Sequence, residues 1–596
     1  MRGLTRRWVL KPPPPPPEGK TPPDGARPQG SPSEGRSLLQ RVLAARGLCD
    51  PQLVERFCEP KLNHLHGPEM LPNVDQAAER LIDAVRQGQR IVIYGDYDVD
   101  GIAATAILHH VIKAVEPEAD LHSYVPHRLD EGYGLNCDAM KQIKSEGADL
   151  VVSVDCGITG REPAATAREI GLDLIITDHH NVPDGGRPLP EAILVHPCLP
   201  GSDYPFGDLC GAGVAFKLAW RFATLWCGSE RVSENLQKTL LDMLPLAALG
   251  TIADIVPLVE ENRIIASYGL RLIRQSPLIG LQALIEASDL TDEHIDSEKV
   301  GFILGPRLNA CGRMGHAAEA VRLLTDAPPE EAQTIARRLT QLNRQRQQTE
   351  RTIFDQAAQM AEDANMTGRD NRMIVLAHES WHPGVIGIVC SRLVNRFGRP
   401  AILFQHQGDV CKGSARSIDG YSIHDALMAC EDRLSTFGGH DMAAGLSLNT
   451  ADLPVFTESI TAHANERISP EDLTPAIKID CDAALEELDL QTVKQIGALS
   501  PFGRANPRPV LRVNRVTVAD PPRQIGANGR HLSFRVRQDE GSQRRIIRAV
   551  WWGAGHLAGD IAAGMTLDVA LEPKINEWNG RVSVEAEVRD VMLRES

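Results

Sequence analysis

Between residues 90 and 200 the hydrophobic pattern switches repeatedly between short apolar runs and longer amphipathic segments. Ile91–Gly95 and Leu150–Val154 are continuous apolar runs rich in Val and Ile, which is typical of buried strands. Further strands are expected near 120–125 and over Leu172–Thr177, and an apolar helix over Ile102–Val115. Strands that alternate with helices in this way predict a parallel sheet with right-handed crossovers.

The rest of the chain changes pattern in distinct steps. Residues 1–35 are rich in Pro, Gly and Ser. A tail without a binding role is favoured over a proline-rich segment that binds another domain. A helical pattern from about 326 has a wholly polar middle at Arg344–Gln348, which is typical of a helix that bridges two domains. These patterns predict a disordered leader over 1–35, an α/β domain with N-terminal helices over 36–325, a connecting helix over 326–368, a second α/β domain over 369–470 and a β-rich, OB-like domain over 471–596.

Composition narrows the class of protein. A chain of 596 residues is too long for one core, and 42% hydrophobic with 24% charged residues is typical of a soluble globular protein. The net charge of −16 excludes a uniformly basic surface but leaves room for a local basic groove. Twelve scattered cysteines without a C-x-x-C pair favour a reducing cytoplasm and argue against zinc ribbons. We find no signal peptide and no membrane-spanning apolar run, so a cytoplasmic protein is expected.

The turn after the first strand carries the first candidate chemistry. Asp96, Asp98 and Asp100 alternate with Tyr97 and Val99, and Gly101 follows. Each pair of like charges about 4 Å apart costs roughly 4 kcal/mol at an effective dielectric near 20, and a divalent cation removes this penalty. A solvated acidic turn is the alternative. Because ligands of open α/β sheets bind beyond the carboxyl ends of strands, the position favours a metal site.

Other predicted strands end in the same kind of residue. Asp155 follows Leu150–Val154, and Asp178, His179 and His180 follow Leu172–Thr177. Three strands that deliver Asp or His at one edge of a sheet predict a single site. Asp254 is the one charged residue in the apolar stretch 244–258, and such an acid is rarely buried unless it is paired or binds a metal. A helix cap or an exposed face is the alternative, and we favour a ligand.

Three further motifs are weaker on their own. The stretch 305–315 is expected to be a glycine- and arginine-bearing loop that suits an anion, whereas 413–417 and 437–440 taken singly are best explained as plain turns. Between 504 and 548 the chain has eleven arginines against three acidic residues. Arginines on short strands near Trp551, Trp552 and Trp578 favour single-strand binding over a solvated sheet face.

Taken together, the motifs resemble those of a known family. They are Asp96-Tyr97-Asp98-Val99-Asp100-Gly101, Asp155-Cys156-Gly157, Asp178-His179-His180 and Gly250-Thr251-Ile252-Ala253-Asp254. In this combination they resemble the DHH phosphoesterase superfamily and, within it, a branch of bacterial single-strand-specific exonucleases, from about residue 40 to the end. The resemblance implies a parallel-sheet DHH domain, a long helix, a second α/β (DHH-associated) domain and an OB-like domain.

The resemblance also implies an activity and its residues. It implies a 5′-to-3′ exonuclease that releases mononucleotides from single-stranded DNA in repair and recombination, with two Mn²⁺ or Mg²⁺ ions. Asp155 would bridge the ions, Asp96 would bind a metal or orient a water, and His180 would face the scissile phosphate, whereas Asp178 would steady the ring of His179. The implied metal ligands are Asp96, Asp98, Asp100, Asp155, His179 and Asp254, and the implied substrate contacts are Arg128, Arg307, Asn309, Ser414, Arg416 and His440.

Partners and alternatives follow from the same comparison. A monomer without membrane contact is expected, recruited by single-strand-binding protein and a RecQ-type helicase. The alternative enzyme is another DHH phosphoesterase, acting on short oligonucleotides, polyphosphate or cyclic dinucleotides. A catalytically inactive scaffold predicts missing ligands, whereas every expected metal position here is Asp or His. A protein that only binds single strands through the C-terminal domain leaves the acidic residues unexplained.

Overall fold

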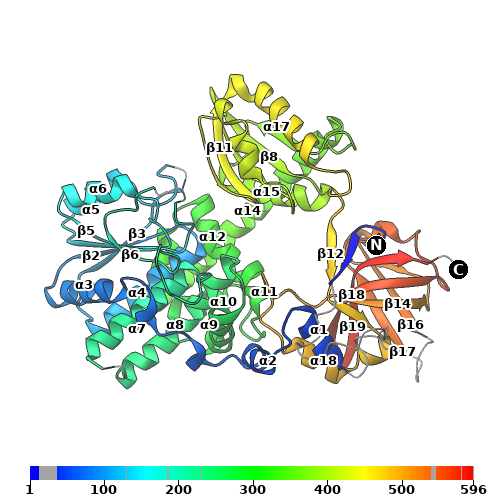
Figure 1. Ribbon diagram of the computed structural model, residues 1–596, viewed down its shortest axis with the longest axis horizontal. Helices are drawn as coiled ribbons and strands as arrows, with labels where there is room; N and C mark the ends of the chain where they lie inside the picture. Colours follow the sequence, from blue (N-terminus) through cyan, green and yellow to red (C-terminus); the bar gives the residue numbers. More distant parts are fainter. Residues whose placement is uncertain are drawn as a thin grey trace, which may run out of the picture.

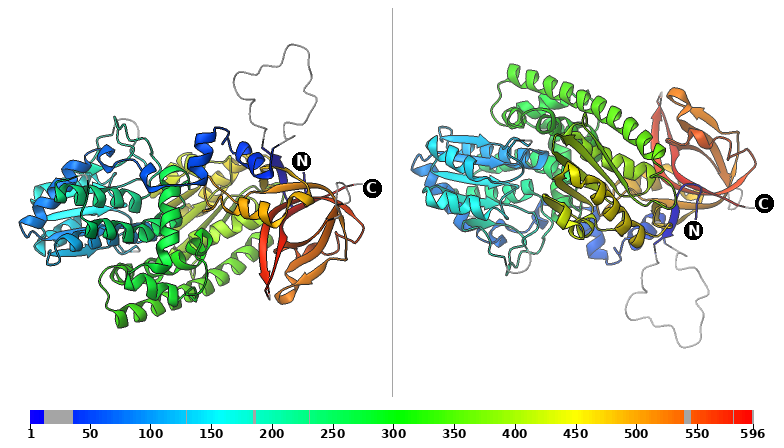
Figure 2. Two further views of the ribbon diagram at one scale, coloured as in Figure 1. Left: turned by 90° about the horizontal axis from the view of Figure 1, so that it is seen from below. Right: turned by 90° about the horizontal axis from the view of Figure 1, so that it is seen from above.

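Two α/β units and a C-terminal β unit follow one another along the chain (Figure 1). The structure, a computed structural model, describes residues 1–11, 36–128, 130–183, 187–229, 231–538, 545–578 and 580–594. Seen from two further sides, the molecule is elongated, with the first unit at one end and the β unit at the other (Figure 2). Within the described residues, no helix is long and apolar enough to cross a membrane. The predicted fold class is confirmed.

The first unit is built on a parallel sheet of five strands in the order β3-β2-β4-β5-β6. Their bounds are β2 Ile91–Gly95, β3 Leu121–Tyr124, β4 Leu150–Val154, β5 Asp173–Thr177 and β6 Ile193–Val195. The chain moves from β2 to β3 on one side and then to β4 on the other, so the strand order reverses at β2. In open α/β sheets, the crevice beyond the carboxyl ends at such a reversal is where ligands bind.

Helices cover both faces of this sheet. One core packs α5 (Cys137–Ser145) and α6 (Arg161–Glu169) against side chains such as Val151 and Ile176. The larger core, on the other face, buries side chains such as Ile93 and Val152 under helices that continue to the end of the unit. These are α3 Val74–Arg86, α4 Val99–Val115, α7 Gly211–Cys227, α8 Glu234–Ala253, α9 Glu260–Leu272, α10 Ile279–Glu286, α11 Ser297–Lys299, α12 Gly305–Met314 and α13 Ala318–Leu324. The continuous apolar runs predicted as strands are therefore buried on both faces.

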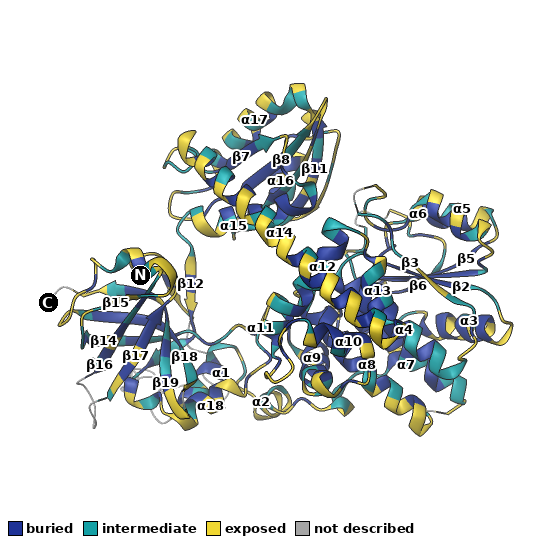
Figure 3. Cartoon of the chain, turned by 180° about the vertical axis from the view of Figure 1, so that it is seen from behind, coloured by how far each residue is buried: buried dark blue, intermediate teal, exposed yellow. Residues whose placement is uncertain are grey.

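The prediction of an anion-binding loop over 305–315 is wrong, because nearly all of these residues form the helix α12. This helix continues a short π-helix over Val300–Leu304. A Cβ at Gly312 would lie 2.7 Å from the carbonyl oxygen of Tyr97. The glycine therefore serves the close packing of α12 on the acidic turn. The long connecting helix α14 follows as Pro329–Asp363, with buried and exposed stripes along its length (Figure 3).

The second unit is a five-stranded sheet in the order β10-β11-β9-β8-β7. Its elements are β7 Ile374–His378, α15 Pro383–Phe397, β8 Ala401–Gln407, β9 Val410–Arg416, α16 Ile423–Met428, β10 Thr436–His440, β11 Ala443–Asn449 and α17 Leu453–Arg467. The motifs at 413–417 and 437–440 are not turns: they lie mostly in β9 and β10, both of which pair with β11. A Cβ at Gly413 would lie 2.6 Å from the Phe404 ring, which explains a glycine inside a strand.

The C-terminal unit is a closed barrel, because β14 pairs with both β18 and β16 and completes the circuit β14-β18-β19-β17-β16. Its elements are β12 Ala476–Ile479, β13 Cys481–Ala483, α18 Leu490–Gly497, β14 Leu511–Val518, β15 Arg523–Ile525, β16 His531–Gln538, β17 Arg545–Trp551, β18 Thr566–Trp578 and β19 Arg581–Leu593. Several arginines that favoured nucleic-acid binding instead pair with carboxylates. Arg512 pairs with Asp482, and Arg548 with Glu585.

The N-terminal residues differ from the prediction. Residues 12–35 of the expected leader lie outside the described residues, but Arg7–Leu10 form β1, which pairs in parallel with β12. The Trp8 side chain is buried, and its Nε1 donates to Asp590 Oδ2 at 2.8 Å. The helix α1 (Leu38–Ala45) packs in the core of the β unit, although residues 36–325 were predicted to form the first α/β domain. Periodicity showed that this helix buries one face, but not against which partner.

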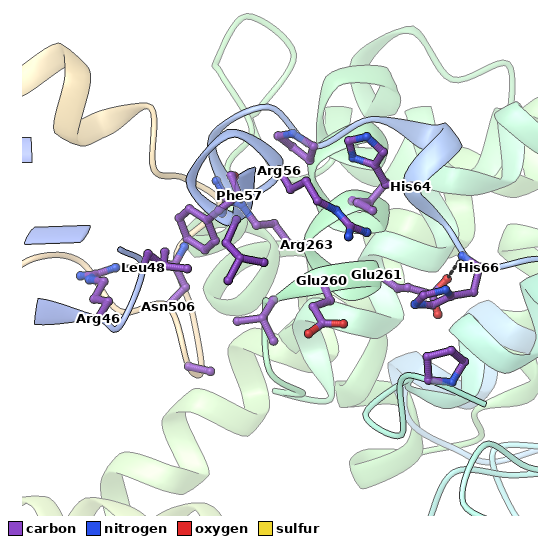
Figure 4. Close-up of a pocket in the computed structure, with 16 residues that line it drawn as sticks. Arg46, Leu48, Arg56, Phe57, His64, His66, Glu260, Glu261, Arg263 and Asn506 are labelled. Atoms are coloured by element: carbon purple, nitrogen blue, oxygen red, sulfur yellow. Dashed lines mark hydrogen bonds between the residues drawn. The ribbon is translucent and has the colours of Figure 1, made fainter. Parts of the chain in front are cut away.

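The β unit is fastened to the first unit by Arg263. This arginine of α9 is 2% exposed, and its guanidinium donates to the carbonyls of Phe57 in α2 (Pro51–Cys58), Leu499 and Ser500 at 2.7, 2.9 and 2.9 Å. A cavity of about 470 Å³ lies beside it, bordered by α2, α9 and Asn506 (Figure 4). Burial lowers the pKa of Arg263 to about 10, so the side chain stays charged at neutral pH.

We expect Arg263→Met to loosen this junction. Methionine keeps the aliphatic stem but leaves the carbonyls of Phe57 and Ser500 without their donor, at a cost of about 1–3 kcal/mol each, whereas the Leu499 carbonyl still accepts from Asn506 Nδ2. The midpoint of thermal unfolding should fall by several degrees, and proteolysis should cut between the two units. Arg271→Met is the matched control, because Arg271 belongs to the same helix but lies at its end. Equal midpoints for both variants would show that Arg263 does not hold the junction.

Candidate active site

The acidic turn is folded as the N-terminus of α4. Asp98 is the N-cap, and its carboxylate accepts from the backbone N–H groups of Asp100 and Gly101 at 2.9 and 3.3 Å. A Cβ at Gly101 would lie 2.6 Å from the backbone nitrogen of Asp96, so the turn requires glycine there. Asn309 of α12 accepts from the N–H of Val99 at 3.1 Å. Three carboxylates are thus held at one strand end, beside the positive end of a helix.

Asp100 reaches into the N-terminus of α7. Its carboxylate accepts from the N–H groups of Gly211 and Ala212 at 2.6 and 2.9 Å. Two glycines leave room for this arrangement: a Cβ at Gly211 would lie 2.5 Å from the Asp155 carboxylate, and one at Gly250 would lie 2.3 Å from Asp100 Oδ1. The sequence motif had already marked Gly250, whereas Gly211 carried no signal.

Asp155 follows β4 with a φ of 62°, a left-handed conformation that aspartate tolerates better than most residues. His179 Nε2 lies 3.1 Å from Asp155 Oδ1, 3.6 Å from Asp254 Oδ2 and 3.8 Å from Asp100 Oδ2. Three groups place one possible ligand atom of each member within 4.8 Å of the others: Asp96, Asp98 and Asp155; Asp100, His179 and Asp254; Asp155, His179 and His180. All six predicted metal ligands therefore meet at one edge of the sheet.

These residues fit divalent cations by an independent criterion. Asp96 Oδ1, Asp155 Oδ1 and His179 Nε2 are buried and make no hydrogen bond within the described residues. Burial raises the pKa of Asp96 and Asp155, and neighbouring carboxylates raise it further. Burial and then the charges of Asp100 and Asp98 raise the pKa of Asp254 to about 8. A cluster of carboxylates that repel one another and lack hydrogen-bond donors is suited to hard cations such as Mn²⁺ and Mg²⁺.

Asp178 does not steady the His179 ring as expected. Its Oδ1 lies 2.7 Å from Nδ1 of His180, whereas its bond to His179 is from the backbone N–H and not from the ring. Burial alone would raise the pKa of Asp178, but the bond to His180 and the charge of its ring lower it to about 2. Burial likewise disfavours the His180 cation, yet Asp178 raises the pKa of His180 to about 9. The pair is therefore a carboxylate and an imidazolium at neutral pH.

Two residues that sequence reasoning missed contact His180. The Tyr133 hydroxyl lies 3.2 Å from His180 Nε2 and donates to the carbonyl of Asp155 at 3.2 Å. His196 is buried, and its Nε2 donates to the carbonyl of His180 at 2.7 Å. Tyr133 lies in a polar loop and His196 just after β6, so the only available signal was their place near strand ends.

Arginines border the acidic cluster. Arg128 stacks over the Tyr97 ring at 4.7 Å, and its charge lowers the pKa of Asp96 against the larger effect of burial. Burial lowers the pKa of Arg313 to about 9, with contributions from the neighbouring charges of Arg128, Arg346 and Arg416. Sequence reasoning named Arg128 and Arg416, but it missed Arg313 and Arg346. The group suits an anion beside the carboxylates.

The second unit contributes to the same region. A Cβ at Gly387 of α15 would lie 3.3 Å from Arg416 Nη2 and 3.4 Å from Ser414 Oγ, so these two side chains converge over that glycine. Asn181 Nδ2 donates to His440 Nδ1 at 3.2 Å, which links the loop after β5 to β10. Arg307 points elsewhere: it donates to Ile303 and Thr340, toward α14. The structure thus brings Arg128, Ser414, Arg416 and His440 to the site but not Arg307.

We expect metal-free protein to lose stability as the pH rises from 6.5 to 8.5. The pKa of Asp254 is about 8 and that of His180 about 9, so the folded protein retains protons that the unfolded chain releases near pH 4 and 6.5. Folding is then favoured at the lower pH, and this advantage fades as the pH approaches the folded pKa values. Thermal unfolding in EDTA should show a lower midpoint at pH 8.5. Saturating Mn²⁺ should remove most of the difference, and a rising midpoint in EDTA would contradict the assignment.

Comparisons with known proteins agree with this geometry. Profiles of the DHH family N-terminal domain, the DHHA1 domain and the RecJ OB domain match residues 90–251, 370–466 and 479–590. The single-stranded-DNA-specific exonuclease RecJ of Bacillus subtilis is 38% identical over 94% of this chain and 68% of its own length. Crystal structures of RecJ from Thermus thermophilus with Mn²⁺ and with Mg²⁺ align with TM-scores of 0.78 and 0.72 and identities of 32% and 30%. Each alignment covers 93% of this chain, and 76% and 74% of the respective RecJ chains.

A parallel sheet with clustered carboxylates at its strand ends, followed by a DHHA1 domain, defines a DHH-type protein. This chain belongs to the RecJ family. The resemblance inferred from the four motifs is confirmed.

Proposed function

We propose that this protein is a metal-dependent exonuclease that removes 5′-mononucleotides from single-stranded DNA in the 5′-to-3′ direction, in DNA repair and recombination. The observation that carries the proposal is that Asp96 Oδ1, Asp155 Oδ1 and His179 Nε2 are buried atoms without a hydrogen-bond partner within the described residues, and that each belongs to a possible metal-ligand group. Membership of the RecJ family, whose curated relatives are named single-stranded-DNA-specific exonucleases, supports the substrate.

The ligand groups support two cation positions. Asp96 and Asp98 would hold one, Asp100, His179 and Asp254 the other, and Asp155 lies close to both. When bound, two Mn²⁺ or Mg²⁺ ions neutralise charge on the phosphodiester and lower the pKa of the attacking water. Asp155, held in its left-handed conformation and packed against Gly211, would contribute a carboxylate oxygen to the ions.

The remaining residues bind and orient the substrate. His180, kept protonated by Asp178, supplies a positive charge 4.0 Å from Asp155 Oδ1 and is suited to stabilising negative charge on the scissile phosphate. Arg128 and Arg416, with Ser414, would bind the 5′ end and the backbone phosphates. Asn309 would act indirectly, because its side chain holds the acidic turn.

Contacts between the two α/β units support the restriction to single strands. Asn181 reaches His440, and Arg313 of α12 donates to the carbonyl of Gly384 at the start of α15 at 3.0 Å. The site is therefore bordered closely by both units. A DNA duplex is much wider than a single strand, so we expect it to be excluded from the site.

Three further expectations belong to this proposal. The division at residues 325, 368 and 470 is supported approximately by the profile matches, which fall within the proposed units, whereas the pairing of β1 with β12 and the packing of α1 do not support a boundary at 35. Recruitment of a monomer by single-strand-binding protein and a RecQ-type helicase is supported only by the family resemblance. A reducing cytoplasm is supported by the twelve cysteines, all of which are free thiols.

The proposal is tested with 5′- and 3′-labelled single strands of about 30 nucleotides and the matching blunt duplex. Each is incubated with Mn²⁺, Mg²⁺ or EDTA. We expect mononucleotides from the 5′ end of the single strand, none in EDTA and little product from the duplex. Binding without cleavage in every metal would instead favour a scaffold. Cleavage of cyclic dinucleotides or very short oligonucleotides alone would favour another DHH phosphoesterase.

A further inference from the structure

An arginine-lined cavity of about 950 Å³ lies between the N-terminal segment and the second α/β unit. Its lining includes Arg2 and Arg7 from the segment around β1, and Arg369, Arg372 and Arg399 from the second unit. Two acidic residues, Asp370 and Glu471, also line it. Five arginines against two carboxylates give this cavity a positive charge in a chain whose net charge is −16. The cavity shares no residue with the metal-ligand groups.

Most of the cavity's arginines have no carboxylate partner within the described residues, although the charge of Arg7 helps to lower the pKa of nearby Asp472. Within the described part of the chain, Arg2, Arg7 and Arg369 make no side-chain hydrogen bond or ion pair, and they are exposed. Arg372 donates through Nη1 to the carbonyl of Asn465, whereas its buried Nε has no partner among the described residues. By contrast, arginines of the barrel such as Arg512 pair with acidic neighbours. Unpaired guanidinium groups around one cavity are suited to phosphate oxygens.

The backbone around the cavity is held in place. Asp590 accepts from the backbone N–H groups of Thr5 and Arg6 and from Trp8 Nε1, at 2.8–3.0 Å, and fixes the segment that carries Arg2 and Arg7. On the opposite wall, buried Arg399 donates to the carbonyls of Met366 and Gly368 at 2.8 and 2.9 Å. This arginine thereby orders the loop that carries Arg369. The cavity is built from two fixed walls.

One end of the second sheet connects this cavity with the candidate active site. Arg416, which borders that site, pairs across the sheet with Ala401, and Ala401 pairs with Ile374. Arg399 and Arg372 lie two residues before these partners, at the same end of the sheet. Neighbouring strands are about 4.8 Å apart, so the paired residues Arg416, Ala401 and Ile374 span roughly 10 Å across the sheet. A strand held by Arg416 therefore has further positive side chains along the same edge.

We propose that the arginine cavity is a phosphate-binding subsite for the part of a single strand that lies outside the candidate active site. The subsite deepens the proposed function and rests on it. Arg2, Arg7 and Arg369 contact backbone phosphates of the strand, while Arg128 and Arg416 hold its 5′ end. The N-terminal segment, anchored by Trp8 and Asp590, is then part of the nucleic-acid surface.

The test compares the triple variant R2A/R7A/R369A with R80A/R168A/R322A, whose arginines already pair with Asp173, Glu191 and Glu331. Both variants change the net charge equally. Fluorescence anisotropy in EDTA measures binding of labelled oligothymidylates of about 5 and about 20 nucleotides over a range of salt concentrations. For the longer strand we expect R2A/R7A/R369A to bind about tenfold more weakly, with a salt slope smaller by about 2, because about 0.7 is lost per phosphate contact. The shorter strand should bind both variants equally.

Two results would overturn the proposal. One is an unchanged salt slope for the longer strand, and the other is equal weakening for the shorter and the longer strand. A competition arm with thymidine monophosphate separates the sources of phosphate: if the triple variant loses only mononucleotide binding, the cavity is a nucleotide pocket and the strand subsite is wrong. Because binding is measured without metal, a wild-type protein that binds strands but cleaves none would contradict the proposed exonuclease and leave the subsite standing.

Discussion

Asp155→Asn is expected to lower the rate of single-strand cleavage by about 10³-fold or more, because it removes a charge from two of the three ligand groups at once. Asparagine also tolerates a φ near 62°, so the backbone after β4 should be preserved. The same substitution relieves repulsion among the buried carboxylates. The metal-free variant should therefore unfold at a higher temperature than the metal-free wild type, while its gain from Mn²⁺ should be smaller.

The opposite signs for activity and stability distinguish a lost ligand from a damaged fold. Asp173→Asn is the control: Asp173 begins the neighbouring strand at the far end of the sheet, where it makes an exposed ion pair with Arg80. Such a pair contributes about 0–1 kcal/mol, so both cleavage and the unfolding midpoint should stay near wild type. Cleavage by the Asp155 variant within tenfold of wild type in Mn²⁺ would remove Asp155 from the candidate site.

The site residues that the sequence placed together, and that lie together in the structure, are those at the ends of neighbouring strands. A buried apolar strand must end in a turn, and parallel strands end at a common edge, so Asp96, Asp155 and His179 could be brought together from the pattern alone. The same reasoning recovered β2 and β4 with their observed bounds, because strands buried on both faces are nearly continuous apolar runs, interrupted in β4 only by the buried Ser153.

The errors concern both partners and elements. The amphipathic α1 was assigned to the first α/β domain but packs in the barrel core, since periodicity defines a buried face and not what covers it. Asp178 was assigned to His179, whereas its carboxylate contacts the ring of His180. The two histidines are adjacent in the sequence, and the sequence does not show in which direction each ring points. The stretch 305–315 looked like a loop because of its glycines, yet Gly312 serves the packing of a helix against Tyr97.

Residues from distant segments had only weak sequence signals or none. Tyr133 and His196 contact His180 from two different loops, and the arginines Arg313 and Arg346 lie near Arg128 only after α12 and α14 have packed. Gly211 belongs to the same category. In the sequence it is an ordinary glycine at the start of a helix. Its role is seen only in the structure, where a Cβ at this position would collide with the Asp155 carboxylate.

Gly211→Ala is the second substitution for which we expect a large effect. Alanine normally stabilises a helix by roughly 0.5–1 kcal/mol relative to glycine. Here its Cβ would lie 2.5 Å from the Asp155 carboxylate, so either the carboxylate or the start of α7 must move. A shift of α7 would also lengthen the 2.6 Å bond from the Gly211 N–H to Asp100 Oδ2. Because a displacement of about 1 Å at a reacting centre can cost about 10²-fold, we expect kcat to fall by about that factor.

The matched control for this substitution is Gly301→Ala, since a Cβ at Gly301 would meet no atom within 4 Å. That variant should keep wild-type cleavage and Mn²⁺ affinity. For Gly211→Ala, Mn²⁺ affinity measured by calorimetry should fall together with kcat, whereas the circular dichroism spectrum should match wild type. Lost cleavage with unchanged Mn²⁺ affinity would place the fault in substrate binding, and unchanged cleavage would show that α7 does not set the position of Asp155. A joint loss would mean that the geometry of the ligands, and not only their identity, depends on a glycine that no catalytic motif contains.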